Sequence, residues 1–141
     1  IVKSLEKLNV KIKFISDGDV SGAISVVDAK KNIDIYLGIG GGPEGVLAAA
    51  ALSCYGGQIQ GRLVLNNEEK IRAKKLGIND FNKKYNLEDM VKGDIIFCAT
   101  GVTNGDLTNG VKDLGNEYEV NTFALHKSKN INKIVKNIYN K

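Results

Sequence analysis

Residues 33–55 read IDIYLGIGGGPEGVLAAAALSCY and place three structural signals in a row. Apolar residues alternate over residues 33–37, which predicts a strand, and the glycines at 38–42 predict a loop. Pro43 is suited to the first position of a helix. Residues 44–55 are nearly all apolar, which predicts a helix buried on more than one side. A strand, a glycine loop and a buried helix in succession favour a layered α/β fold.

The rest of the chain continues this alternation of strands and helices. The start has amphipathic helical spacing, residues 10–15 alternate as in a half-buried strand, and Asp19 is expected to cap a helix that runs through Val27. Further patterns predict a strand within 58–65, a charged helix at 67–76 closed by Gly77, and strands at 94–99 and 118–127. Residues 131–139 fit either a helix or a last strand. We therefore expect one α/β domain over residues 1–141, with a layered mixed, largely parallel sheet flanked by helices.

Composition excludes several classes of protein. With 141 residues, 43% of them hydrophobic, the chain is long enough to bury a core and too apolar to be disordered. No apolar run approaches the roughly 20 residues of a membrane span, so no membrane partner is expected. The net charge of +4 permits nucleic-acid binding, but no aromatic residues are interleaved with the lysines, so none is predicted. Cys54 and Cys98 lie in apolar segments and are expected to be reduced, as in a cytoplasmic protein.

Three loops follow predicted strands and hold residue types that bind phosphate, sugar hydroxyls or hard metal ions. They are residues 17–19, 38–44 and 100–106. At the carboxyl edge of a parallel sheet such loops converge on a ligand. Asp17 and Asp19, joined by Gly18, suit vicinal hydroxyls or a divalent cation, although the sequence alone favours the simpler interpretation of a turn residue and a helix cap. Residues 100–106 are open to a simpler interpretation too, as the exit from a strand.

The glycine loop admits two functional interpretations. A helix start behind glycines offers free backbone N–H groups to an anion, and Glu44 is well placed to bind a metal ion there. A favourable contact with the helix dipole, of about 0.3–1 kcal/mol, explains Glu44 without a ligand. Residues 40–45 also match G-x-G-x-x-G, so a Rossmann-type dinucleotide-binding module is an alternative. Pro43 and Glu44 inside this fingerprint argue against it, as does the lack of an acidic residue at Asn66 and Asn67.

No familiar arrangement for nucleophilic catalysis is present. His126 has no Cys or Ser partner in a recognisable pattern and is expected to face solvent.

Four stretches together resemble the GlpX-type, class II fructose-1,6-bisphosphatases. They are ISDGDV at 15–20, YLGIGGGPEGV at 36–46, QGRL at 60–63 and FCATGVTNGDL at 97–107. These stretches occur in the order and spacing of that family and extend over nearly the whole chain. Four long motifs in order are far more specific than a single glycine loop.

The resemblance implies an activity and a set of site residues. Members of the family hydrolyse the 1-phosphate of fructose 1,6-bisphosphate to fructose 6-phosphate in gluconeogenesis, and sedoheptulose bisphosphate is a second substrate open to related enzymes. By resemblance Asp17, Gly18, Asp19 and Gly41 bind the substrate, and Glu44 binds Mn²⁺ or Mg²⁺. No catalytic residue is assigned to this chain. The family resembles the lithium-sensitive sugar phosphatases in fold and is expected to form homo-oligomers.

One departure from the family pattern is larger than any substitution. Family members are about twice as long, and the half without a counterpart here is the N-terminal one, which carries most of the metal ligands. We therefore expect the chain to be the C-terminal domain of a two-domain phosphatase, with the cut just before Ile1. Its main partner is then the missing N-terminal domain, and the chain alone is expected to be inactive. The family pattern also favours a strand over a helix for residues 131–139.

Overall fold

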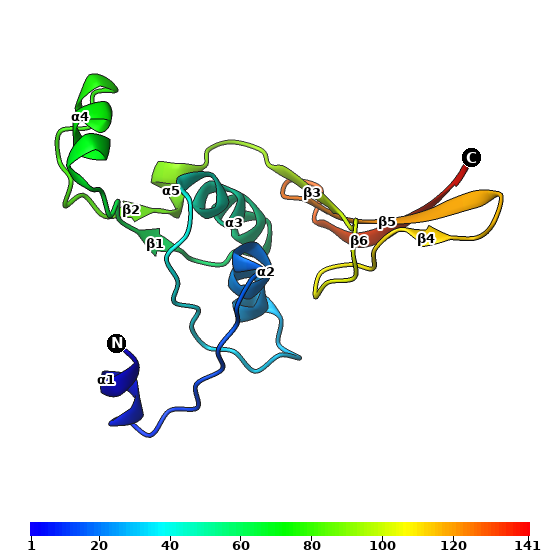
Figure 1. The fold of residues 1–141 in the computed structure, drawn as a ribbon, viewed down its shortest axis with the longest axis horizontal. Helices are drawn as coiled ribbons and strands as arrows, with labels where there is room; N and C mark the ends of the chain where they lie inside the picture. Colours follow the sequence, from blue (N-terminus) through cyan, green and yellow to red (C-terminus); the bar gives the residue numbers. More distant parts are fainter.

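The computed structural model describes residues 1–141 as an elongated molecule (Figure 1). The main sheet lies at one end, helices lie in the middle, and a further helix lies at the other end beyond a short strand pair. The helices are α1 Val2–Glu6, α2 Asp19–Ile24, η1 Ser25–Val27 (a 3-10 turn), α3 Gly42–Tyr55, α4 Asn67–Lys75 and α5 Leu87–Met90. The strands are β1 Gln60–Gly61, β2 Tyr85–Asn86, β3 Ile96–Thr100, β4 Lys112–Asp113, β5 Glu117–His126 and β6 Ile131–Asn140.

Strand β5 is the centre of the main sheet. β6 pairs with its whole length, while β3 and β4 pair with the two ends of its other edge. Every pair is antiparallel, including the separate pair of β1 with β2. The mixed α/β class is confirmed, but the largely parallel sheet predicted from the sequence is wrong. The physical reason is the connections: β5 and β6 are joined by a short turn that reverses the chain, and no helix crosses over between strands of this sheet.

Two predicted strands do not form. Residues 10–15 and 33–37 have no strand beside them, and residues 58–65 contribute only the two residues of β1. Strands require a neighbour that accepts and donates their ladder hydrogen bonds, and β propensity alone does not supply one. The glycine loop is therefore not preceded by a paired strand, and the βαβ context that a dinucleotide fingerprint needs is absent. The strand predictions for β3, β5 and β6 are confirmed, including the strand alternative for residues 131–139.

The helix predictions hold with shifts at the ends. Gly18 is the N-cap of α2, in a left-handed conformation with φ 83°, so Asp19 is the first helical residue and the expectation that it caps the helix is wrong. In α4, Asn66 accepts a hydrogen bond from the backbone of Glu69, whose carboxylate accepts one from the backbone of Asn66. This reciprocal cap explains why a charged segment with one buried residue starts a helix there.

The core consists of two small clusters, each of which includes residues of α3. One joins α2 and α3 to the sheet through Ile24, Ala51, Phe97, Phe123 and Leu125. The other joins α2, α3 and α5 through Ala23, Ala48, Leu52 and Leu87. The prediction that the helix in residues 44–55 is buried on more than one side is thus confirmed.

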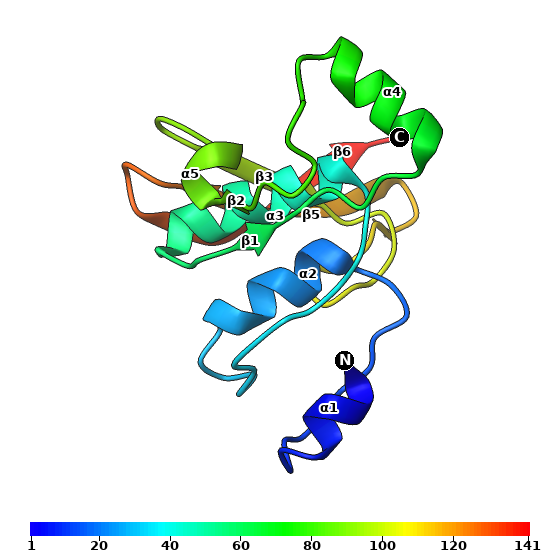
Figure 2. The same ribbon diagram turned by 90° about the vertical axis from the view of Figure 1, so that its left-hand side faces the viewer.

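Only 15 of the 141 residues are buried, so much of the chain lies outside these clusters. Helix α1 stands away from the body in both views (Figures 1 and 2). None of the helices has the length and apolar character required to cross a membrane.

Candidate functional site

The site predicted from the sequence is built where the start of α2 meets the glycine loop. The hydroxyl of Tyr36 donates a hydrogen bond to Oδ1 of Asp19 at 2.8 Å. The second oxygen of Asp19 lies so close to Gly40 that a Cβ at position 40 would collide with it. Two segments far apart in sequence are therefore held together by one carboxylate. Glycine at position 40 is what allows this close approach.

Glu44 lies at the same loop, in the first turn of α3. Its side chain turns back over Gly41, where an added Cβ would collide with the carboxylate. The carboxylate has no hydrogen-bond or ion-pair partner within the chain, unlike that of Asp19. Gly41 thus leaves room for Glu44, and the negative charge lies near the positive end of the helix dipole.

Asp17 and Gly18 form the turn before α2. The backbone N–H of Gly18 donates to Oδ1 of Asp17 at 2.7 Å, and the hydroxyl of Ser21 donates to the carbonyl of Gly18 at 2.7 Å. A Cβ at Gly18 would be strained by its positive φ and would crowd Ser21. Asp17 therefore serves the turn that presents Asp19, and its other oxygen stays exposed to solvent.

Tyr36 is a site residue to which the sequence interpretation assigned no role. Burial raises the pKa of its hydroxyl, and the hydrogen bond to Asp19 and the charge of that carboxylate raise it further. The hydroxyl therefore stays protonated at neutral pH and keeps donating to Asp19. Its position two residues before the glycine loop is the signal that points to it, since a Cβ at Gly38 would collide with its hydroxyl.

The third predicted loop, residues 100–106, does not join this site. Asp106 forms an ion pair with Lys31, with 3.7 Å between Nζ and Oδ2. The loop glycines serve packing: a Cβ at Gly101 would collide with the backbone of Asn109, and the N–H of Gly110 donates to Asn104. The predicted convergence of all three loops is thus wrong for this one. Because these contacts hold residues 100–106 close to the end of β3, the loop does not reach the start of α3.

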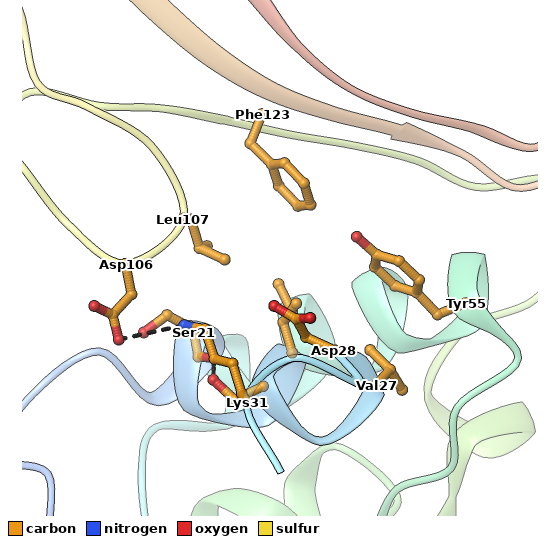
Figure 3. A pocket seen from close by; sticks show the side chains of 10 residues that line it. Ser21, Val27, Asp28, Lys31, Tyr55, Asp106, Leu107 and Phe123 are labelled. Atoms are coloured by element: carbon orange, nitrogen blue, oxygen red, sulfur yellow. Dashed lines mark hydrogen bonds and ion pairs between the residues drawn. The ribbon is translucent and has the colours of Figure 1, made fainter. Parts of the chain in front are cut away.

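Asp106 instead lines a pocket of about 140 Å³ between the loop and the α2–η1 segment (Figure 3). Phe123 comes from β5, Leu107 and Asp106 come from the loop, and Asp28 and Lys31 lie on the side of the α2–η1 segment. The polar residues that line the pocket are Ser21, Ser25, Asp28, Lys31, Tyr55 and Asp106. The pocket includes none of Asp17, Asp19, Gly41 and Glu44, so it is separate from the predicted site.

The expectation that His126 faces solvent is wrong, because its side chain is only 15% exposed. Its Nε2 lies 2.8 Å from Oδ2 of Asp94, and the hydroxyl of Ser128 reaches both that oxygen and the same ring nitrogen. In a catalytic triad the acid and the nucleophile bond to different nitrogens of the histidine, so this is not one. The hydrogen bond from His126, followed by two from Ser128, holds the pKa of Asp94 far below its usual range. The three residues fasten the β5–β6 turn to the residues before β3.

The carboxylates of this chain do not assemble a metal centre. No group of three or more His, Cys, Asp or Glu side chains is placed to hold an ion. A hard divalent cation takes about six oxygen ligands, of which Glu44 and Asp19 offer a small part. The residues present therefore do not by themselves fit the metal ion that the family resemblance implies.

Fold and site together describe an α/β chain in which two carboxylates each lie against a glycine of the loop that opens α3. The chain belongs to the family described as bacterial fructose-1,6-bisphosphatase, glpX-encoded, which matches residues 1–139. The family resemblance predicted from the four motifs is thereby confirmed.

Two relatives illustrate how much of such a protein is present. The chain is similar to fructose-1,6-bisphosphatase class 2 of Haemophilus influenzae, with 38% identity over 149 residues that cover 95% of this chain and 45% of that protein. It is also similar to the D-fructose 1,6-bisphosphatase class 2/sedoheptulose 1,7-bisphosphatase of Synechococcus sp. (strain JA-3-3Ab), with 33% identity over 89% of this chain and 40% of that protein. The chain thus spans less than half the length of these relatives.

Proposed function

We propose that this chain is the sugar-binding part of a class II fructose-1,6-bisphosphatase. The observation that carries the proposal is that Asp19 and Glu44, from two family motifs, lie against the adjacent loop glycines Gly40 and Gly41 within a family match over residues 1–139. The reaction of the intact enzyme is hydrolysis of the 1-phosphate of fructose 1,6-bisphosphate to fructose 6-phosphate in gluconeogenesis. The name of the Synechococcus relative adds sedoheptulose 1,7-bisphosphate as a second substrate to test.

The residues have distinct roles in this proposal. Asp17, Gly18, Asp19 and Gly41 bind the sugar bisphosphate, and the carboxylate of Asp19 accepts hydrogen bonds from hydroxyls of the sugar. Tyr36 supports this role, because its hydrogen bond orients Asp19 at 2.8 Å. Glu44 is one ligand of a Mn²⁺ or Mg²⁺ ion, and the absence of any partner within the chain leaves its oxygens available. The groups that activate the attacking water, and those that bind the phosphate at the other end of the sugar, lie outside this chain.

The chain acts in this proposal as one α/β domain over residues 1–141, resembling the C-terminal domain of the lithium-sensitive sugar phosphatases. It requires the missing N-terminal domain, which supplies the remaining metal ligands, and it is inactive alone. The same proposal includes a cytoplasmic location and a homo-oligomeric enzyme. The incomplete donor set around Glu44 supports the need for a second part.

The test uses a chimera in which this chain replaces the matching 149 residues of the Haemophilus influenzae relative. We expect the chimera to release phosphate from fructose 1,6-bisphosphate with Mn²⁺ and the chain alone to release none. Glu44→Gln in the chimera is expected to lower kcat by about 100-fold or more, as for removal of a charged group that acts in the transition state. The binding of Mn²⁺, followed by calorimetry, should weaken in parallel.

Glu68→Gln is the matched control, because Glu68 is also an acidic residue in the first turn of a helix but lies on α4, outside the glycine loop (Figure 1). It should leave kcat and Mn²⁺ binding unchanged. Full activity of the Glu44→Gln chimera would remove Glu44 from the metal site. Phosphate release by the chain alone would contradict the proposed division of the enzyme.

A further inference from the structure

Two extended segments of the N-terminal third have the sequence pattern of strands but no strand partners. Residues 10–16 and 32–40 make no hydrogen bond from backbone to backbone. Each such segment leaves a row of N–H and C=O groups available to an added strand. Both segments pass the same side of α2, since a Cβ at Gly22 would lie 2.7 Å from Cε2 of Tyr36 and 2.8 Å from Cδ1 of Ile15. They are thus held next to each other on one helix.

Most apolar side chains of these segments are exposed. In the second segment Tyr36 lies against α2, while Ile35 is 71% exposed and Leu37 and Ile39 are exposed with it. In the first segment Phe14 is 74% exposed. Alternation with a period of two places Ile35, Leu37 and Ile39 on one face of the second segment. We call this set of exposed residues in the two segments, 10–16 and 32–40, the open face.

The total accessible surface of the chain is larger than that of a folded monomer of the same mass. The accessible surface is 10540 Å² for a mass of 15.2 kDa. A folded monomer of this mass exposes about 7,100 Å², so about 3,400 Å² is in excess. An obligate interface removes about 1,000–2,500 Å² from each partner. The excess is therefore at least as large as the surface that an obligate partner covers.

We propose that the open face binds β-strands from the part of the family polypeptide that this chain does not span, which makes residues 10–16 and 32–40 strands of a joint sheet. The unmatched 55% or so of the Haemophilus relative is long enough to supply such strands. The two segments also lead directly into the site, the first to Asp17 and the second to Gly40. A partner paired with them comes to lie beside Asp19 and Glu44, where further oxygen ligands are needed. A second copy of this chain would bring only the same incomplete set of donors.

This inference rests on the proposed function for the identity of the partner, but its test has a structural readout. The measurement is hydrogen exchange of backbone amides, followed by mass spectrometry, in the chain alone and in the chimera with the Haemophilus relative. We expect residues 10–16 and 32–40 to exchange rapidly in the chain alone and at least about 100-fold more slowly in the chimera, as for amides in ladder hydrogen bonds. Fast exchange in a cooperatively folded chimera would overturn the inference.

Matched variants separate the open face from general surface effects. In the chimera, Ile35→Lys should raise the exchange rate of residues 32–40 by about tenfold, because a buried charge replaces an interface anchor. Leu76→Lys is the control, since Leu76 is 80% exposed at the end of α4 and lies outside the open face. Equal effects of the two variants would contradict the assignment of the surface.

Two further outcomes keep the proposals apart. If the open face is protected in a chimera that releases no phosphate, the inference is supported and the proposed function is contradicted. If the chimera releases phosphate and the open face is not protected, the proposed function is supported and the inference is contradicted. Sedimentation of the chain alone tests the other occupant and does not depend on the chimera's folding. We expect a monomer. A stable dimer with slow exchange at residues 32–40 would show that a second copy covers the open face.

Discussion

The C-terminal and N-terminal parts of the chain carry similar apolar alternation and differ in what lies beside it. Residues 117–140 form two ten-residue strands paired from end to end, and β3 covers the free edge of β5. Residues 10–15 and 33–37 have comparable patterns, yet their backbones are unpaired and most of their apolar side chains are exposed. The difference teaches that a segment with the sequence pattern of a strand forms a strand only where the chain also places a partner strand beside it.

The largest effect is expected from removing a buried side chain of the paired C-terminal sheet. Leu125 on β5 is 1% exposed and belongs to the cluster that joins the sheet to α2 and α3. Leu125→Ala should lower the free energy of unfolding by about 2–5 kcal/mol, from lost burial and the cavity left behind. Urea unfolding followed by circular dichroism measures the change.

Ile96→Ala is the control for this substitution, because Ile96 lies on the neighbouring strand β3 and is 69% exposed. Its cost should stay below about 1 kcal/mol, which is the range of β propensity. Similar losses for both variants would mean that the sheet does not pack on the helices as described.

A smaller effect concerns the turn that joins β5 to β6. Asp94 accepts hydrogen bonds from His126 and Ser128, which depress its pKa in the folded state below the ordinary value of 3.8. A depressed pKa stabilises the fold above the ordinary value, and the stabilisation is lost as the pH falls below it. Asp94→Asn should therefore lower the melting temperature at neutral pH, and its difference from the unaltered chain should shrink below pH 3.8.

Thermal unfolding between neutral pH and about pH 3 gives this profile, since ordinary carboxyl groups titrate near pH 4. Asp34→Asn serves as the control, because Asp34 is exposed and accepts no hydrogen bond from the chain. A constant difference between Asp94→Asn and the unaltered chain at all pH values would exclude the carboxylate as the source of the effect.

The smallest predicted effect lies in α4, which forms with little packing behind it. Asn66→Ala removes the side-chain acceptor of the reciprocal cap and should cost the helix about 1 kcal/mol. Local hydrogen exchange of residues 67–75 should increase, while that of β5 should not change. No change in α4 would mean that tertiary contacts, rather than its cap, hold this helix.

Much of the local structure was predictable from the sequence. The helix at 44–55, the charged helix before Gly77 and the strands at 94–99 and 118–127 follow from signals within a few residues. The assignment of residues 131–139 to a strand needed the family pattern, since their spacing alone fits a helix too. Sheet direction was not predictable in this way, because alternation is the same for parallel and antiparallel strands.

The candidate site shows the same division. Its glycines and carboxylates were found from their motifs, whereas Tyr36 was overlooked because its role depends on a hydrogen bond across 17 residues. The third loop was wrongly placed at the site, since the expectation assumed a parallel sheet. Its glycines and Asn104 instead close the loop on itself.

By itself the sequence determined the family, the glycine loop and the positions of most helices and strands, because motifs and caps act over short distances. Only the tertiary structure decided that the sheet is antiparallel, that Asp19 meets Gly40 and that the open face has no partner within the chain. These features depend on which segments lie side by side. A backbone hydrogen bond requires two groups about 2.9 Å apart, and no local pattern reports what stands across that distance.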